Sequence, residues 1–194
     1  MNEQSTGKHA KNEAPRGSFL KTFIVDILIA LVLAGILLYF IRPTIVKQNS
    51  MENTLMPNDY VLLLRQAYKS EDPERGDIIV FKSDLVDETT GDDKLLIKRI
   101  IGLPGDEISI SDDQLYINGE AYEEDYLAEG YTPAWDNPSE GETLTVPEGE
   151  YYVMGDNRAV SIDSRSSDVG TVSKEAIEGK AWIRLFPLNK ITKF

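Results

Sequence analysis

The sequence predicts a mainly antiparallel β domain preceded by one apolar helix of membrane-spanning length. From residue 43 onward, short runs of apolar, β-branched and aromatic residues alternate with turn residues, a pattern typical of strands. A single short helix is predicted among these runs, so the strands are not joined by the repeated helical crossovers of a parallel sheet. A β-sandwich and a folded barrel are the two architectures that fit this pattern.

Residues 1–20 form a predicted amino-terminal tail. They are mostly polar and lack apolar periodicity, which is typical of disordered segments. The tail contains His9, the only histidine of the chain.

Residues 21–42 are predicted to form a transmembrane helix. The apolar run from Phe23 to Ile41 is close to the roughly 20 residues that cross a bilayer. A cleaved secretory signal is the alternative, but its apolar region is shorter and ends at a small-residue cleavage site. Arg42-Pro43-Thr44-Ile45 follows here instead, which favours a retained anchor.

The charges that flank this helix predict its orientation. Four basic residues precede it and two follow it closely: Lys8, Lys11, Arg16 and Lys21 before, Arg42 and Lys47 after. Because Lys and Arg are enriched on the cytoplasmic side, we expect a single-pass protein of the cell membrane. Its amino terminus is then cytoplasmic, and residues 43–194 form an extracytoplasmic β domain.

The predicted strands of this domain follow in order along the chain. They cover residues 60–65, 77–82, 95–101, 107–110, 114–117, 150–154 and 180–185. Asn118-Gly119 supplies the residues of a tight hairpin turn, and Ser173 is a predicted cap for a short helix over residues 173–177. Residues 83–94 and 120–142 are polar and less regular, so we expect insertions at the edge of the β domain there.

The charge of the chain is strongly acidic. The formal charge is −13, and residues 43–194 contain 15 Lys and Arg against 30 Asp and Glu, which gives −15. Such a surface repels phosphate, so nucleic-acid binding is excluded. The runs Glu123-Glu124-Asp125 and Asp92-Asp93 lack the alternating ligand spacing of a calcium loop and are predicted to be solvated. No metal or cofactor is predicted.

Ser50 and Lys98 are the strongest catalytic candidates. The chain has no cysteine, and its one histidine lies in the tail, so a Cys nucleophile is excluded and a His-based triad is disfavoured. Lys98 shares one strand face with Leu96 and Ile100, where poor solvation lowers the pKa of an amine. A Lys with a lowered pKa can take the proton of a Ser nucleophile. The alternative is a Lys that extends from a strand edge into water.

Two loops complete this candidate site. Ser50 follows the predicted membrane helix closely, and Met51 and Leu55 beside it are expected to be exposed or inserted apolar bulk. Residues 155–165 are dense in Asp, Asn, Arg and Ser. Taken alone they indicate a hydrogen-bonded loop, and beside a Ser–Lys pair they offer a Ser hydroxyl that could orient the amine.

The chain resembles bacterial type I signal peptidases, which are membrane-anchored Ser–Lys endopeptidases that remove signal peptides from exported proteins. The similarity covers the amino-terminal anchor and four segments in order. They are Ser50-Met51-Glu52-Asn53-Thr54-Leu55, Arg75-Gly76-Asp77-Ile78-Ile79-Val80-Phe81, Lys98-Arg99-Ile100-Ile101-Gly102-Leu103-Pro104-Gly105-Asp106, and Gly155-Asp156-Asn157-Arg158 to Asp163-Ser164-Arg165.

The resemblance implies a role for each matching residue. Ser50 is the implied nucleophile and Lys98 the general base of an acyl-enzyme reaction. A hydrogen bond from Ser161 is implied to orient Lys98. Two ion pairs are also implied, Asp163–Arg165 and Asp156–Arg99. The implied fold is the family's all-β catalytic core. The implied partners are signal-peptide-bearing precursors and the lipid bilayer, with cleavage at the outer face of the cytoplasmic membrane.

Two positions depart from the family pattern. The family usually has Pro where this chain has Asn53, and Ser or Gly where it has Gln48. In members with Ser at the latter position, the hydroxyl helps to hold the oxyanion. Here the backbone N–H of Ser50 must contribute, and the Gln48 amide is a candidate second donor. Loss of one such donor typically lowers the rate by about 10²- to 10³-fold.

Two other functions fit parts of the sequence. A self-cleaving repressor that shares this β core needs a basic DNA-binding part, which the anchor and the acidic charge oppose. A catalytically silent, membrane-anchored binding module is supported by Asn53 and Gln48. It is opposed by the intact catalytic and supporting residues, which are Ser50, Lys98, Ser161 and Asp163.

Overall fold

The computed structural model describes residues 16–87, 90–127 and 130–194, so most of the predicted tail, including His9, lies outside the described residues. The chain divides into two compact units at Tyr39–Phe40. The first contains helix α1 (Arg16–Phe40), whose residues Phe19–Phe40 are long and apolar enough to cross a membrane.

The helix ends two residues before the predicted boundary. Ile41 and Arg42 instead begin strand β1 (Ile41–Ile45), which sequence analysis did not predict. The physical reason is Pro43, because a proline disfavours helical geometry at the residue before it. The extended backbone then pairs with β2 (Tyr60–Leu64), with Pro43 opposite Leu62.

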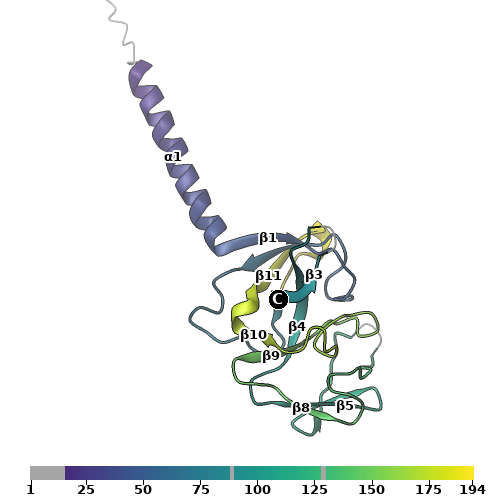
Figure 1. Ribbon diagram of the computed structural model, residues 1–194. Coiled ribbons are helices and arrows are strands. Elements are labelled where there is room, and N and C mark those ends of the chain that lie inside the picture. The colour runs from purple at the N-terminus through teal and green to yellow at the C-terminus, as the bar shows by residue number, and fades with distance from the viewer. Residues whose placement is uncertain (1–15, 88–89, 128–129) are drawn as a thin grey trace, which may run out of the picture. The chain divides into compact units, whose positions relative to one another are not determined.

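The second unit is built on a sheet of eight antiparallel strands (Figure 1). Its order is β1-β2-β11-β3-β4-β9-β10, and β12 also pairs with β11. The strands not yet given are β3 (Ile78–Val86), β4 (Asp93–Gly102), β9 (Glu150–Met154), β10 (Val172–Ser173), β11 (Ile177–Phe186) and β12 (Thr192–Lys193). The prediction of a mainly antiparallel β domain is confirmed. β4 lies between β3 and β9, so it is an interior strand of the sheet.

A smaller sheet of four strands has the order β7-β6-β5-β8. Its strands are β5 (Glu107–Ser111), β6 (Gln114–Ile117), β7 (Glu120–Ala121) and β8 (Thr143–Thr145). Asn118 and Gly119 connect β6 to β7 with φ angles of 55° and 79°. Both values suit a type I′ turn, so the predicted hairpin is confirmed.

Two local predictions need correction. Residues 83–94 are not an irregular insertion, because β3 and β4 continue through half of them and Val86 pairs with Asp93. Ser83 is buried and donates from Oγ to the Lys94 carbonyl at 2.9 Å, so polarity there did not indicate a loop. The helix after Ser173 is a three-residue 3₁₀ turn, Lys174–Ala176. The predicted cap is present, since the Ser173 side chain accepts a hydrogen bond from the Ala176 N–H at 3.3 Å.

The loop that carries Ser50 is packed onto the large sheet. Met51 and Leu55 are both fully buried and join the core cluster of Val46 and Leu63, so the prediction that they are exposed is wrong. The loop closes on itself at its base, where the Val46 N–H donates to the Asp59 carbonyl at 3.0 Å. Met51 and Leu55 therefore anchor the loop in the domain core and are not themselves available for contact with lipid.

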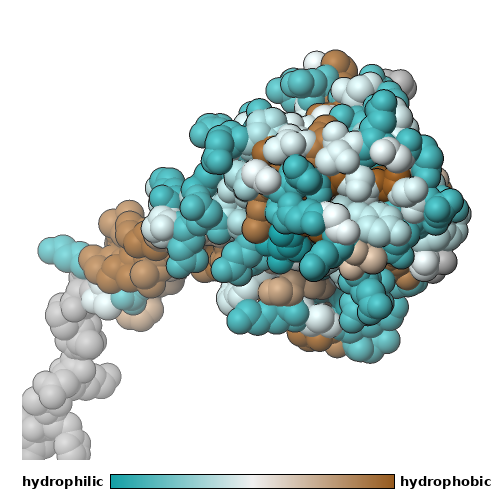
Figure 2. All heavy atoms as spheres, turned by 90° about the horizontal axis from the view of Figure 1, so that it is seen from below, coloured by the Kyte–Doolittle hydropathy of each residue, from teal (hydrophilic) through white to brown (hydrophobic). Residues whose placement is uncertain are grey.

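The surface of the second unit is mixed. Hydrophilic residues predominate on the face seen in Figure 2, with apolar residues scattered among them, whereas apolar residues cover the helix.

Candidate active site

Lys98 is buried in the interior strand β4, with only 1 % of its surface exposed. Burial removes water from the ammonium and lowers the pKa of Lys98 to about 8, although the Asp163 carboxylate opposes part of this effect. The alternative of a lysine that extends from a strand edge into water is therefore wrong. At neutral pH a usable fraction of Lys98 is the free amine.

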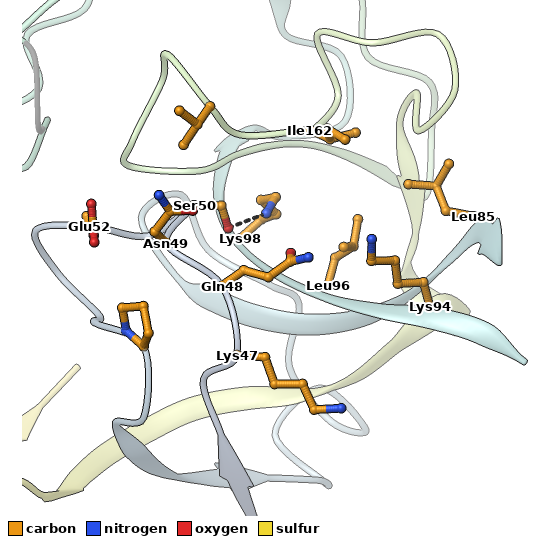
Figure 3. A pocket seen from close by; sticks show the side chains of 12 residues that line it. Lys47, Gln48, Asn49, Ser50, Glu52, Leu85, Lys94, Leu96, Lys98 and Ile162 are labelled. Carbon is orange, nitrogen blue, oxygen red and sulfur yellow. Dashed lines mark hydrogen bonds between the residues drawn. The ribbon is translucent and has the colours of Figure 1, made fainter. Parts of the chain in front are cut away.

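Ser50 lies within hydrogen-bond distance of this amine. The Lys98 Nζ to Ser50 Oγ distance is 2.7 Å (Figure 3). The Asn157 N–H donates to the Ser50 carbonyl at 3.0 Å and ties the serine loop to the loop of residues 155–165. In the part of the chain that the structure describes, the Ser50 N–H has no hydrogen-bond acceptor, so it remains available to a ligand.

Asp163 and Arg165 form an ion pair behind the dyad, with 2.9 Å between Arg165 Nε and Asp163 Oδ1 and no exposure of either side chain. Burial by itself raises the pKa of Asp163, but the Arg165 guanidinium and the hydrogen bond from the Gly155 N–H outweigh it, so the pKa is below its usual value. Asp163 is therefore a carboxylate near neutral pH, and it favours the charged form of Lys98.

Ser161 differs from its expected arrangement. It is fully buried, but its Oγ makes no hydrogen bond to any residue that the structure describes. The expected hydrogen bond from Ser161 to Lys98 is thus not formed, and the amine bonds to Ser50 instead. The hydroxyl lies close to the Gly155 backbone and to Asp163, whose pKa it helps to lower.

Asp156 and Arg99 form a second ion pair. Arg99 donates to both Asp156 oxygens, at 2.9 and 2.7 Å. Arg99 follows Lys98 in β4 and so points to the opposite face of the strand. Thr54 Oγ1 also donates to Asp156 at 2.5 Å, which links the ion pair to the serine loop. Tyr126 stacks on the guanidinium, with 4.0 Å between Arg99 Cζ and the ring centre.

Residues 122–137 contribute contacts that sequence analysis missed. Glu124 was predicted to be solvated, but its side chain is 2 % exposed and pairs with the buried Arg158 at 2.5 Å. The prediction is wrong because an acidic run gives no sign of a distant arginine. Trp135 lies on Arg165, with 4.7 Å between Cζ and the ring centre. A buried arginine in residues 155–165 needs a carboxylate or an aromatic ring as a partner. This need was the only signal in the sequence that could have indicated the roles of Glu124 and Trp135.

Gln48 lies at the entrance of the site and makes no side-chain hydrogen bond to a described residue. In Figure 3 its side chain extends from the serine loop along the cleft, toward the side where Leu96 and Lys94 lie. The structure thus leaves the amide free to meet a ligand in the cleft.

A cleft of about 540 Å³ opens over the dyad. Apolar side chains from three segments line it, together with Gln48 and the unpredicted Lys47 and Lys94; the apolar residues include Leu85, Leu96, Val160 and Ile162. The described residues include no group of three or more His, Cys, Asp or Glu side chains placed to hold a metal ion. The site can therefore bind an apolar peptide segment beside a Ser nucleophile and an amine base.

Comparison with known proteins places this site in a family. The model of the signal peptidase, peptidase S26, family matches residues 19–186. The chain belongs to this family. Members of the signal peptidase family are serine endopeptidases that cleave signal peptides from secreted precursors, and the predicted family and enzyme class are confirmed.

The relatives of this signal peptidase family member match most of its length. Signal peptidase I of Bacillus amyloliquefaciens is 36% identical over 194 residues, covering 96% of this chain and 98% of that protein. Signal peptidase I S of Bacillus subtilis (strain 168) is 38% identical over 173 residues, covering 86% and 89%. A crystal structure of a signal peptidase I from Enterococcus faecalis V583 is 39% identical, covers 57% of this chain and 97% of that chain, and has a TM-score of 0.45.

Proposed function

We propose that this protein removes amino-terminal signal peptides from exported precursors by a Ser50–Lys98 acyl-enzyme mechanism at the outer face of the cytoplasmic membrane. The observation that carries the proposal is the 2.7 Å contact between Ser50 Oγ and the buried Lys98 amine. No histidine or cysteine in the described residues lies near Ser50 to serve in place of the amine.

The reaction follows from this geometry. Neutral Lys98 accepts the Ser50 proton as Oγ attacks the scissile carbonyl, and the Ser50 N–H donates to the developing oxyanion. The Lys98 ammonium then gives the proton to the leaving amine, which departs as the mature protein. A water molecule, deprotonated by Lys98, attacks the ester and releases the signal peptide as a carboxylic acid with Ser50 restored.

The supporting residues keep this pair in place. Asp163 with Arg165, and Asp156 with Arg99, hold the loops around the dyad through buried hydrogen bonds. We assign to Ser161 the role of a second partner for Lys98, used when Ser50 Oγ is acylated and no longer available. Its hydroxyl is buried beside Gly155, in the loop that is tied to the Ser50 carbonyl, which supports this role.

Helix α1 is proposed as a membrane anchor with a cytoplasmic amino terminus. Its length and its flanking basic residues support this orientation. Nine residues, 41–49, separate the helix from Ser50, and a chain of that length spans at most about 30 Å. The cleft therefore lies within reach of precursors that emerge at the bilayer surface.

Cleavage of an exported precursor by the detergent-solubilised full chain tests the proposal. We expect one product pair, with a new amino terminus at the signal-peptide junction, measured by mass spectrometry. A silent binding module would retain the precursor uncut, and a protease of another specificity would cut elsewhere.

The pH dependence of cleavage reports the ionisation of Lys98. Because its pKa is about 8 in the folded protein, kcat/KM should rise about tenfold per pH unit below 8 and level off above about 9. Between pH 8 and 10.5 the unfolded chain keeps a proton on Lys98 that the folded chain has lost, so the free energy of unfolding rises with pH in that window. Initial rates with a precursor peptide from pH 6 to 10 measure the dependence of kcat/KM on pH. A rate that is flat from pH 6 to 9 would contradict Lys98 as base.

Gln48→Ala tests the second oxyanion donor. If the Gln48 amide donates to the oxyanion only in the transition state, the substitution should lower kcat about 10-fold with little change in KM. Gln48→Met is the matched variant, because it keeps the length of the side chain and removes the N–H donors without adding a charge. An unchanged kcat in both variants would exclude the donor, and a rise in KM alone would assign Gln48 to substrate binding.

A further inference from the structure

Lys94 places a second cation in the cleft, on the same face of β4 as the catalytic amine. Side chains alternate along a strand, so Lys94, Leu96 and Lys98 share one face. All three line the cleft, and Lys94 is half-buried. Figure 3 shows the Lys94 side chain rising beside Leu96, on the side of the cleft away from Ser50.

The Lys94 ammonium makes no ion pair with any residue that the structure describes. Other lysines of this acidic domain do: Lys174 pairs with Asp72 at 2.6 Å, and Lys180 with Asp77 at 2.6 Å. Lys47, the other cation at the cleft, is likewise without an ion pair among the described residues.

The charge of the cleft is opposite to that of the domain. Its lining contains Lys47, Lys94 and Lys98 against a single carboxylate, Glu52. Glu52 lies on the far side of Ser50 and accepts a hydrogen bond from the Asn157 amide at 3.3 Å. A cationic cleft in a domain of charge −15 attracts a substrate carboxylate that the rest of the surface repels.

The spacing along β4 locates that carboxylate on the substrate. Lys94 and Lys98 are four residues apart, which corresponds to about 13 Å at the rise of a strand. An extended peptide beside β4 has the same rise of about 3.3 Å per residue as the strand itself. With its scissile carbonyl at Ser50, the side chain that meets Lys94 belongs to a residue about four positions from the scissile bond.

We propose that Lys94, assisted by Lys47, forms a carboxylate subsite that selects substrates with Asp or Glu about four residues from the scissile bond. This inference rests on the proposed function, because it concerns the peptide cleaved at Ser50. The apolar cleft residues beside the dyad then accommodate the side chains nearest the bond, and the lysines select for charge farther along.

Matched precursor peptides test the subsite. Each pair differs only by Glu or Gln at one position, three to five residues from the scissile bond on either side. For the full chain in detergent, we expect kcat/KM to be about threefold higher for Glu than for Gln at one of these positions, the gain of a partly exposed ion pair. The ratio should fall toward one as the salt concentration rises.

Variants assign this selectivity to Lys94. In Lys94→Met the Glu/Gln ratio should fall to about one, and in Lys94→Glu it should fall below one. Lys82→Met is the matched control, because Lys82 lies on the adjacent strand outside the cleft and pairs with Glu178; its ratio should equal that of the unmodified chain. A ratio of one in the unmodified chain, or an unchanged ratio in Lys94→Met, would overturn the subsite. Failure to cleave any peptide would instead overturn the proposed function.

Discussion

Ser50→Ala and Lys98→Ala should each reduce precursor cleavage by about 10⁵-fold or more, since catalytic residues that act as a unit lose nearly all activity when one is removed. No other residue in the described part of the chain can replace either group, because Lys98 Nζ forms its hydrogen bond there only to Ser50 Oγ and no histidine or cysteine is present. Cleavage by either purified variant at the normal rate would exclude the dyad.

The fold of these variants has to be measured separately. The one hydrogen bond of the Ser50 hydroxyl to a described residue is to the Lys98 amine, so Ser50→Ala should melt close to the unmodified protein. Lys98→Ala leaves a cavity at a position that is 1 % exposed, so Lys98→Met, which fills more of that volume, is the better comparison. Lys174→Ala, at an exposed ion pair, should retain both activity and melting temperature.

Lys98→Arg should lose activity to the same extent, although it keeps the positive charge. A guanidinium has a pKa above about 12 and does not accept a proton near neutral pH. Cleavage of a precursor peptide by the purified variant measures this. If the Arg variant cleaves well, Lys98 is a cation that positions the substrate and not a base.

A larger side chain at a buried site can also fail for steric reasons, so a second variant separates the two causes. The chain has no cysteine, and Lys98→Cys therefore creates a single thiol. Alkylation of that thiol with 2-bromoethylamine rebuilds a side chain of similar length that ends in an amine. Recovery of activity after alkylation would show that the amine itself is required, and no recovery in a folded, alkylated protein would contradict the base.

Local patterns in the sequence were sufficient to predict most strands of the domain. Apolar alternation is a property of neighbours in sequence, so it identified β4 and the face that Lys98 shares with Leu96 and Ile100. The turn at Asn118-Gly119 was predictable for the same reason, because its two residues are neighbours in sequence. In residues 83–86 of β3 the buried position is the polar Ser83 and the apolar Val86 is exposed, so no apolar alternation marked this part of the strand and it was mistaken for a loop.

The environment of the acidic residues was beyond such local patterns. Glu124 was predicted to be solvated because it stands in an acidic run, yet it is buried against Arg158, 34 residues away. A charged side chain is buried only where a partner offsets the loss of hydration. That partner comes from another part of the chain, so the burial of Glu124 is a tertiary property.

By itself the sequence determined the chemistry available to this protein: a serine, a lysine in an apolar strand, no cysteine, and a single distant histidine. Only the tertiary structure brought Lys98 Nζ within 2.7 Å of Ser50 Oγ across 48 residues. Only the tertiary structure buries Met51 and Leu55 of the serine loop in the domain core. It also leaves Lys94, in the cleft, without an ion-pair partner among the described residues. The physical reason is that residue type and periodicity act between neighbours, whereas hydration, pKa and catalytic contact depend on which distant segments pack together.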